Sequence, residues 1–150
     1  MGAVLKARRW AVVLLVLLAA ACGDLRVKLA VFNTAAEARS GGAFAAGWVP
    51  EGVPAEASDL RVGYMPDGRQ WGVFAFRPSD AAAVRALTRD EITSGPLTCD
   101  PPGRLEFWPR VIRTPVDVAR VNSTGFRLFH GADGRTYAIN WGQGRAYYWK

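Results

Sequence analysis

The sequence predicts an α+β fold, with a mostly antiparallel sheet of five to six strands and one or two short helices. Several short segments alternate apolar and polar residues, which is the period of a half-buried strand. Gly, Pro and Asp residues, which favour turns, separate these segments. Near the end of the sequence, three such segments are joined by two short glycine-containing loops, which predicts a C-terminal three-stranded meander.

The first strand and the first helix are predicted within residues 25–39. Apolar and charged residues alternate from Leu25, as in a strand, although an extended tether would show the same pattern. Asn33 and Thr34 are residue types that cap helix N-termini, and the alanine-rich residues 35–39 favour a short helix. A Ser-Gly-Gly sequence then ends this helix.

A β-hairpin is predicted next, followed by a second helix. Residues 60–64 alternate in polarity, whereas residues 71–76 are apolar on both faces, as expected for a central strand. The Pro-Asp-Gly sequence at residues 66–68 predicts the turn between them, because Asp tolerates tight geometry and Gly supplies a positive φ. Residues 78–88 predict the helix, with an acidic residue near its positive N-terminal end.

The middle of the chain gives weaker signals. Residues 89–103 are irregular by composition, residues 105–108 predict a short strand that ends at Pro109, and residues 111–121 receive no assignment. The pattern then becomes clear again. The three strands of the meander are predicted at residues 125–130, 135–141 and 145–149.

The first 22 residues predict an export signal. Residues 1–10 are short and basic, residues 11–21 are eleven apolar residues in a row, and Cys22 follows directly. A permanent membrane span is the weaker interpretation, because such a helix needs about 20 apolar residues. The Leu-Ala-Ala-Ala-Cys sequence at residues 18–22 resembles the lipobox of bacterial lipoproteins, although Ala19 stands where leucine is usual. An ordinary signal peptide with an incidental Cys22 is the other alternative.

The lipobox resemblance implies that Cys22 is diacylated and becomes the first residue of the mature protein. We therefore expect a signal peptide at residues 1–21 and a single exported domain at residues 22–150, with residues 22–24 as its anchor or tether. The expected location is the cell membrane, with the domain facing the periplasm or the cell exterior. The expected partners are the membrane, through the lipid, and another envelope protein or polymer.

Charge and cysteine content narrow the function classes. Without residues 1–21, 129 residues remain, with 16 basic and 13 acidic side chains, and these charges are scattered. A nucleic-acid-binding role is not expected from so small an excess. Cys99 has no intramolecular partner if Cys22 is lipidated, so it is expected to be buried or to pair between chains. No Cys/His spacing indicates a metal site, and no cofactor is predicted.

Aromatic residues are the best candidates for a binding surface. Trp48, Tyr147 and Trp149 could contact a small molecule, a glycan or a protein, because each ring combines an apolar body with a polar tip. The alternative is that these rings fill the core. Trp71 is expected in the core because it lies within an apolar strand, and Trp48 is expected to pack between a loop and the sheet.

The sequence contains no recognisable catalytic constellation. It has neither a Gly-x-Ser-x-Gly motif, nor a phosphate-binding loop, nor a dinucleotide fingerprint. His130 is the only histidine and follows an apolar segment beside a turn, where a structural or exposed histidine is more common than a general base. We therefore expect no enzymatic activity, and a weak hydrolase that uses His130 is the least favoured alternative.

Three motifs follow one another within residues 34–76. They are Gly-Trp-Val-Pro at 47–50, Pro-Ala-Glu-Ala-Ser-Asp-Leu at 54–60 and Trp-Gly-Val-Phe-Ala-Phe at 71–76. This order resembles the YbbD-type head domain, which occurs in small, membrane-anchored bacterial proteins of unknown function, and the Tyr-Tyr-Trp tail is also similar. Glu56 stands where that family usually has serine, and the MPDGRQ sequence replaces its run of acidic and asparagine residues.

The resemblance implies an anchored α+β domain and brings no known activity. We therefore expect an uncharacterised, non-catalytic envelope lipoprotein that acts as an interaction or structural module. A small-molecule- or glycan-binding module that uses exposed aromatic side chains is the alternative.

Overall fold

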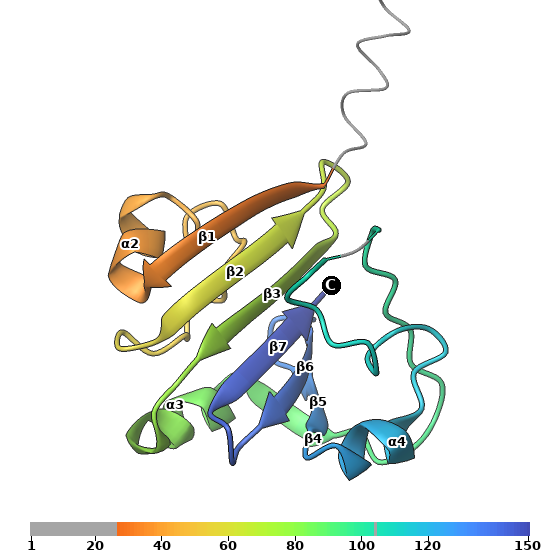
Figure 1. The fold of residues 1–150 in the computed structure, drawn as a ribbon. Helices are drawn as coiled ribbons and strands as arrows, with labels where there is room; N and C mark the ends of the chain where they lie inside the picture. The colour runs from red at the N-terminus through yellow and green to blue at the C-terminus, as the bar shows by residue number, and fades with distance from the viewer. Residues whose placement is uncertain (1–26, 104) are drawn as a thin grey trace, which may run out of the picture.

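The computed structural model describes residues 27–103 and 105–150 (Figure 1). The predicted signal peptide and the predicted lipidation site, Cys22, lie outside these ranges. The strands are β1 (Lys28–Thr34), β2 (Ser58–Tyr64), β3 (Gln70–Ala75), β4 (Thr88–Glu91), β5 (Arg127–Gly131), β6 (Thr136–Asn140) and β7 (Arg145–Trp149). The helices are α2 (Ala35–Ser40), the 3-10 helix η1 (Pro78–Asp80), α3 (Ala81–Ala86) and α4 (Val118–Ser123). Within the described ranges, no helix has the length and hydropathy needed to cross a membrane.

All seven strands belong to one antiparallel sheet in the order β1-β2-β3-β7-β6-β5-β4. The predicted hairpin is β2–β3 and the predicted meander is β5–β6–β7, so both predictions are confirmed. The α+β class with a mostly antiparallel sheet is also confirmed. The sheet has seven strands instead of five or six, and the described residues form three short α-helices and one 3-10 helix instead of one or two helices. The N-terminal alternating segment pairs with β2 as β1, so its strand interpretation is correct within the described residues.

The structure corrects the prediction for residues 105–108, which do not form a strand. The backbone N–H of Trp108 donates to the carbonyl of Leu105 at 3.0 Å, so the segment curls into a turn. Leu105 and Trp108 are both buried, which explains why their apolar pattern resembled that of a strand. Sequence analysis missed β4, whose residues Thr-Arg-Asp-Glu show no apolar alternation.

Helix α2 forms where its capping residues predict it. The Thr34 side chain accepts a hydrogen bond from the backbone N–H of Glu37 at 3.1 Å, which satisfies one free donor of the first turn. Helix α4 lies at the end of the unassigned segment and begins with the same device, since Asp117 accepts from the N–H of Arg120 at 3.0 Å. Each helix buries apolar side chains against the sheet.

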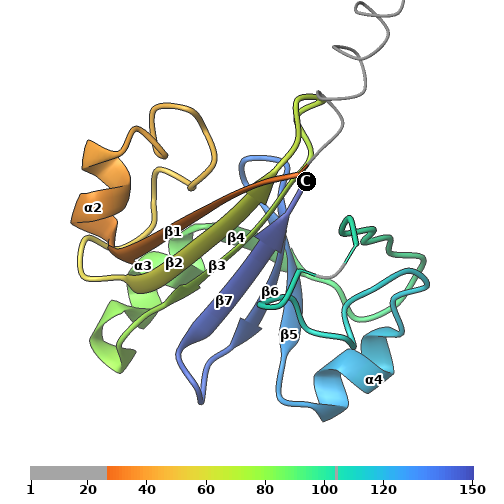
Figure 2. The ribbon, with the colours of Figure 1, turned by 45° about the horizontal axis from the view of Figure 1, so that its top comes forward.

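The sheet carries a hydrophobic core on each face (Figure 2). We call the face that packs against α2, α3 and residues 41–57 the back face, and the face that packs against residues 92–126 the front face. The back core includes Ala38, Phe44, Val84, Phe74, Tyr137, Ile139 and Tyr148. The front core includes Trp71, Cys99, Leu105, Trp108, Ile112, Val121 and Trp149. Trp71 is 2% exposed, so its predicted core position is confirmed.

Candidate functional site

The structure does not bring the three predicted surface aromatics together. Trp48 belongs to the back core and stacks on Tyr64 with ring centroids 3.8 Å apart, so it packs between a loop and the sheet as expected. Tyr147 is half-buried on the front face, where its ring contacts that of Trp108 edge-on. Trp149 is 6% exposed, and its indole N–H donates to the carbonyl of Thr98 at 2.9 Å. These rings lie on both faces of the sheet and form no common surface.

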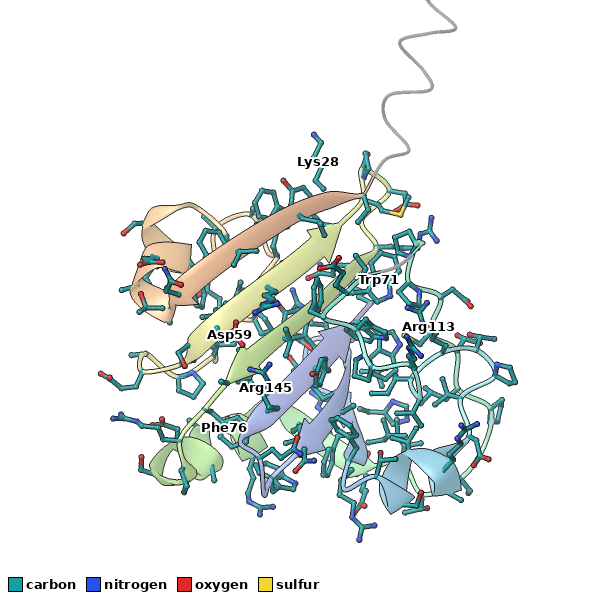
Figure 3. The ribbon with its side chains drawn as sticks, in the orientation of Figure 1. Lys28, Asp59, Trp71, Phe76, Arg113 and Arg145 are labelled. Atoms are coloured by element: carbon teal, nitrogen blue, oxygen red, sulfur yellow. The ribbon has the colours of Figure 1, made fainter. Side chains whose placement is uncertain are left out.

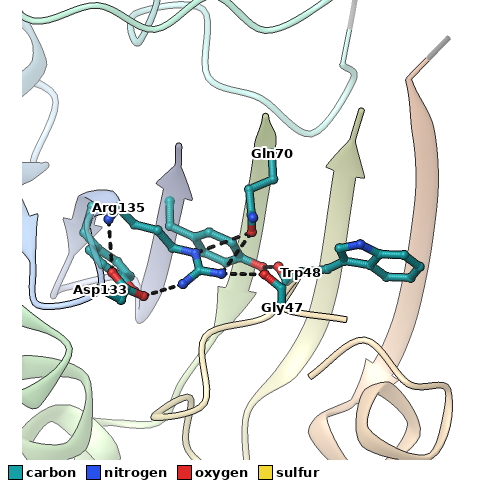
Figure 4. Close-up of polar contacts among 7 residues, drawn as sticks. Gly47, Trp48, Gln70, Asp133 and Arg135 are labelled. Atoms are coloured by element: carbon teal, nitrogen blue, oxygen red, sulfur yellow. Dashed lines mark hydrogen bonds and ion pairs between the residues drawn. The ribbon is translucent and has the colours of Figure 1, made fainter. Parts of the chain in front are cut away.

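A partly buried polar cluster holds the Gly-Trp-Val-Pro loop against the sheet (Figure 4). Asp133 accepts the backbone N–H of Arg135 at 3.1 Å, a local turn that aims the Arg135 side chain across the back face. The guanidinium then donates to the Asp133 carboxylate at 2.5 Å, to Gln70 Oε1 at 3.1 Å and to the carbonyl of Gly47 at 2.5 Å. Beside it, the Tyr148 hydroxyl donates to the carbonyl of Trp48 at 2.7 Å.

The Arg135 side chain is only 11% exposed and its donors are occupied, so the cluster is structural. It connects the loop after α2 to the C-terminal meander, across 88 residues of sequence. Sequence analysis missed it because Arg135 is one of many single arginines. The Asp-Gly-Arg turn sequence gives no sign of its distant partners.

The cluster also makes stability depend on pH through Asp133. Burial raises the pKa of this carboxyl, but hydrogen bonds from the backbone N–H and guanidinium of Arg135, with its charge, hold the pKa below the ordinary 3.8. Asp133 therefore stabilises the fold fully above its unfolded-state pKa. That contribution is lost as the pH falls through the lower folded-state pKa.

We expect Asp133→Asn to flatten the acid dependence of stability. The variant should be less stable than the parent at pH 6, and the difference should shrink as the pH falls below about 4. Urea-unfolding midpoints between pH 6 and pH 2.5 check this, with Asp90→Asn, an exposed position on β4, as the control. A constant difference across this range would contradict the role given to the Asp133 charge.

Cys99 is buried in the front core at 2% exposure, as predicted. Burial, together with the nearby Asp100 carboxylate, raises the pKa of its thiol to about 12. Because the thiolate is the nucleophile, such a thiol is inert at neutral pH. His130 is exposed on β5 opposite Thr136. The expected absence of enzymatic activity stays a prediction. In the described ranges, no three His, Cys, Asp or Glu side chains gather in a way that could hold a metal ion.

We expect Cys99 to react at least roughly a thousandfold more slowly with a thiol reagent at pH 8 than a free cysteine, because its thiolate population is so small. The Cys22→Ser chain leaves Cys99 as the single thiol. Absorbance with an aromatic disulfide reagent measures the rate, and the same chain in urea provides the control. Equal rates in the folded and unfolded chains would show that Cys99 is accessible.

The best candidate for a functional surface is the outer edge of β1. In the described ranges, β1 pairs with β2 alone, at one edge of the sheet. Its side chains Leu29 and Val31 are 62% and 67% exposed and are the only large hydrophobic side chains with such exposure there. An exposed apolar edge strand is an unusual feature in a monomeric protein, because unpaired backbone groups and apolar side chains together favour pairing with another chain.

The direction of the backbone on this edge follows from Asn33. Its N–H donates to Glu37 Oε2 at 2.8 Å and therefore points away from β2. Backbone direction alternates along a strand in an antiparallel pair, so the N–H and C=O groups of Leu29 and Val31 point outward as well. Sequence analysis missed these residues because their alternation with Lys28 and Ala30 resembled that of a strand with one buried face.

The opposite edge of the sheet is different. Strand β4 has four residues, and Arg89, Asp90 and Glu91 are exposed along it. Short length and charged side chains are the usual means of preventing strand addition. Strand β1 has seven residues, of which all but Asn33 have a register partner in β2, and Lys28 is its only charged side chain. Among the residues that the structure describes, the sheet therefore has one protected edge, at β4, and one open edge, at β1.

A groove adjoins the open edge on the front face. It has a volume of about 250 Å³, with one wall from β1 and β2 and the other from the loop after the front-core cysteine. Its lining residues are Leu29, Ala30, Val31, Arg61, Leu105, Glu106 and Phe107. A larger hollow of about 740 Å³ shares Leu105 and Glu106 with the groove and is also lined by Arg110 and Arg113. Arg113 is labelled in Figure 3.

Arg61 in this groove belongs to an ion-paired group on the front face. Asp59 accepts from Arg61 at 3.0 Å and from Arg145 at 2.5 Å. Figure 3 shows Asp59 on β2 and Arg145 on β7, with β3 between these two strands. Burial raises the pKa of Asp59, but its hydrogen bonds with the two arginines outweigh this and hold the pKa below the usual value. The φ of Asp59 is +48°, at the point where the β2–β3 register shifts. Apart from Arg61 and Glu106, the residues that line the groove are apolar.

Comparison with known proteins identifies only the N-terminal part of the domain. No curated protein and no solved structure matches the chain. Residues 28–75 match the family model of the YbbD head domain, and the match does not extend to the Tyr-Tyr-Trp tail. The matched segment comprises β1, α2, β2 and β3 with the Gly-Trp-Val-Pro loop that Arg135 holds. The chain therefore contains a YbbD-head-like segment at residues 28–75.

Proposed function

We propose that this protein is a non-catalytic envelope lipoprotein, anchored through Cys22, that binds another macromolecule at the β1 edge and its groove. The open edge with exposed Leu29 and Val31 is the observation that carries the proposal. Strand addition at such an edge combines backbone hydrogen bonds with contacts of alternate side chains. The lipobox-like sequence at residues 18–22 supports the anchor.

The chemistry of the surface supports binding over catalysis. Leu29 and Val31 are apolar, and the Arg61 guanidinium is already held by Asp59. A catalytic site would need a nucleophile or a general base within reach of a substrate, together with a residue that orients it. Glu106 is the only carboxylate that lines the groove, and no Ser, Cys or His lines it beside Glu106.

The position of β1 in the chain supports contact close to the membrane. Strand β1 begins at Lys28, six residues after Cys22. Six extended residues span at most about 20 Å, so a lipid on Cys22 would hold this edge near the bilayer surface. Confinement to a surface raises the effective concentration of a partner in the same membrane.

Fatty-acid labelling tests the anchor. Cells that express the full chain and are fed an alkyne-tagged fatty acid should label the protein, and Cys22→Ser should abolish the label and block processing. Cys99→Ser is the matched control and should keep both, because Cys99 is buried in the core. A Cys22→Ser chain that is still labelled and processed would overturn the anchoring part of the proposal.

Site-specific photo-cross-linking tests the contact surface. A photoreactive amino acid at Val31 should give adducts in intact membranes at a yield at least tenfold above that of the same group at Asp90 on the protected β4 edge. Both positions are exposed, so accessibility to solvent alone would label them equally. Equal yields, or no adduct at Val31, would overturn the role of the β1 edge.

A further inference from the structure

We infer that the partner at the open edge is a second copy of this chain, bound by antiparallel pairing of β1 with β1 around Ala30. The inference rests on the proposed role of the β1 edge as the contact surface and does not depend on the lipid. The resulting dimer would extend each sheet into the other across a two-fold axis perpendicular to the sheet. Such an interface is isologous, so each contact occurs twice.

The backbone geometry selects the register. Leu29 and Val31 carry the outward-pointing groups, and pairing around Ala30 places Leu29 of each copy opposite Val31 of the other. The two Leu29–Val31 pairs between the copies are then hydrogen-bonded pairs, in which the two opposite residues exchange two N–H···O=C bonds. The two Ala30 residues face each other as a non-hydrogen-bonded pair, with Cα atoms about 4.5 Å apart.

The front face supplies the apolar contact. Leu29 and Val31 point to the same face in both copies, because the two-fold axis is perpendicular to the sheet. Two Leu–Val cross-strand pairs would therefore lie side by side, and they would bury the side chains that are 62% and 67% exposed in the single chain. The two grooves would meet across the axis, since Leu29 and Val31 line each of them.

The back face supplies charge complementarity. The Glu37 carboxylate lies at the outer edge, because it accepts the outward-pointing N–H of Asn33. In the same register, Lys28 of each copy lies opposite Phe32 of the other and beside its Glu37. Both side chains are exposed, and within residues 27–103 and 105–150 neither takes part in an ion pair. The dimer would contain two reciprocal Lys28–Glu37 pairs and no contact between like charges along β1.

Disulfide capture tests this register in the full chain. An interface made by one strand pair is at the small end of specific interfaces, so a covalent readout is better suited than dilution in detergent. The Ala30→Cys chain in membranes should form a disulfide-linked dimer under mild oxidation, because the facing Cα atoms are within disulfide range. Lys28→Cys is the matched control. Its two copies lie four residues apart along the strand, about 14 Å, and should give at least tenfold less dimer.

Charge reversal tests the reciprocal ion pairs. In the Ala30→Cys background, Lys28→Glu and Glu37→Lys should each lower the dimer yield severalfold, and the double reversal should restore most of it. If Glu37→Lys lowered the yield only because the Glu37 contact with Asn33 is lost, the second change, Lys28→Glu, would not restore the yield. A double reversal with no recovery would overturn the proposed pairs.

The outcomes separate the two proposals. The parent chain, with Cys22 and Cys99 alone, sets the background of oxidation. Dimers from Lys28→Cys as abundant as those from Ala30→Cys would indicate random collision and overturn the pairing. No dimer from Ala30→Cys, together with Val31 photo-adducts to other proteins, would overturn the second-copy inference and leave the proposed function in place. No specific adduct at Val31 would overturn the contact surface itself.

Discussion

Replacement of Arg135 by alanine should lower the free energy of unfolding by about 2–3 kcal/mol, because it breaks several hydrogen bonds of a charged group in a partly buried site. The side chain is 11% exposed and bonds to Asp133, Gln70 and the Gly47 carbonyl. Its removal leaves Oε1 of Gln70, a residue that is 8% exposed, without its donor, and it removes the cation that pairs with Asp133. Urea unfolding followed by tryptophan fluorescence would show the change as a lower midpoint.

Arg77→Ala is the matched control for this experiment. Arg77 also contacts two carboxylates, those of Glu56 at 3.7 Å and Asp80 at 3.5 Å, but its side chain is 60% exposed. Exposed ion pairs contribute at most about 1 kcal/mol, so the control should shift the midpoint little. Similar losses for the two variants would mean that the Arg135 cluster is not a buried determinant of stability.

Replacement of Gly72 by alanine should cost about 3 kcal/mol or more in free energy of unfolding, because it forces a steric overlap in the core. Gly72 lies in β3 opposite Tyr148 in β7, and an added Cβ would overlap the tyrosine ring. Tyr148 is 1% exposed and cannot move aside without steric cost. Displacing the Tyr148 ring would also break the hydrogen bond from its hydroxyl to the Trp48 carbonyl. Loss of a hydrogen bond costs more free energy in a buried site than in an exposed one, because water cannot replace the partner.

Two further variants separate the overlap from a general loss of glycine. Gly142→Ala should be nearly neutral, because its Cβ would meet only Asn140 Oδ1, at 3.6 Å. Tyr148→Leu alone should destabilise the fold, and in combination with Gly72→Ala the loss should be smaller than the sum of the two single losses. Additive losses in the double variant would rule out the ring overlap as the cause of the Gly72 effect.

The strands of the hairpin and of the meander could be predicted because their signals are local. In β2 and β5–β7, alternating polarity and the intervening Gly and Asp turn residues occur within a few positions of each other. The cap of α2 is local as well, since Thr34 bonds to the N–H three residues later. Local signals do not depend on the rest of the chain, which is why these elements were identified correctly.

Residues 105–108 and β4 show the limit of such signals. Leu105 and Trp108 have the composition of a strand, but they are apolar because they pack onto the front core from a turn. Strand β4 has no apolar pattern, because it is an exposed edge held by pairing with β5. In both cases the contact that decides the backbone conformation comes from a distant part of the chain.

The two interpretations of the aromatic residues, a binding surface or a filled core, could not be separated by sequence for the same reason. Trp48, Tyr147 and Trp149 could be assigned to faces only after the sheet order was known. Trp149 donates to the carbonyl of Thr98, 51 residues away, and Trp48 stacks on a ring from β2. A sequence gives the size and polarity of each side chain, but it does not give what lies opposite.

The β1 edge shows most clearly what the sequence determined and what the tertiary structure decided. The sequence alone determined that residues from Lys28 onward alternate and that α2 follows Thr34. Only the tertiary structure decided that Leu29 and Val31 face an uncovered part of the sheet, at an edge without a partner among the described strands. The physical reason is that a period of two fixes which side chains share a face, whereas the packing of distant segments fixes which face is buried.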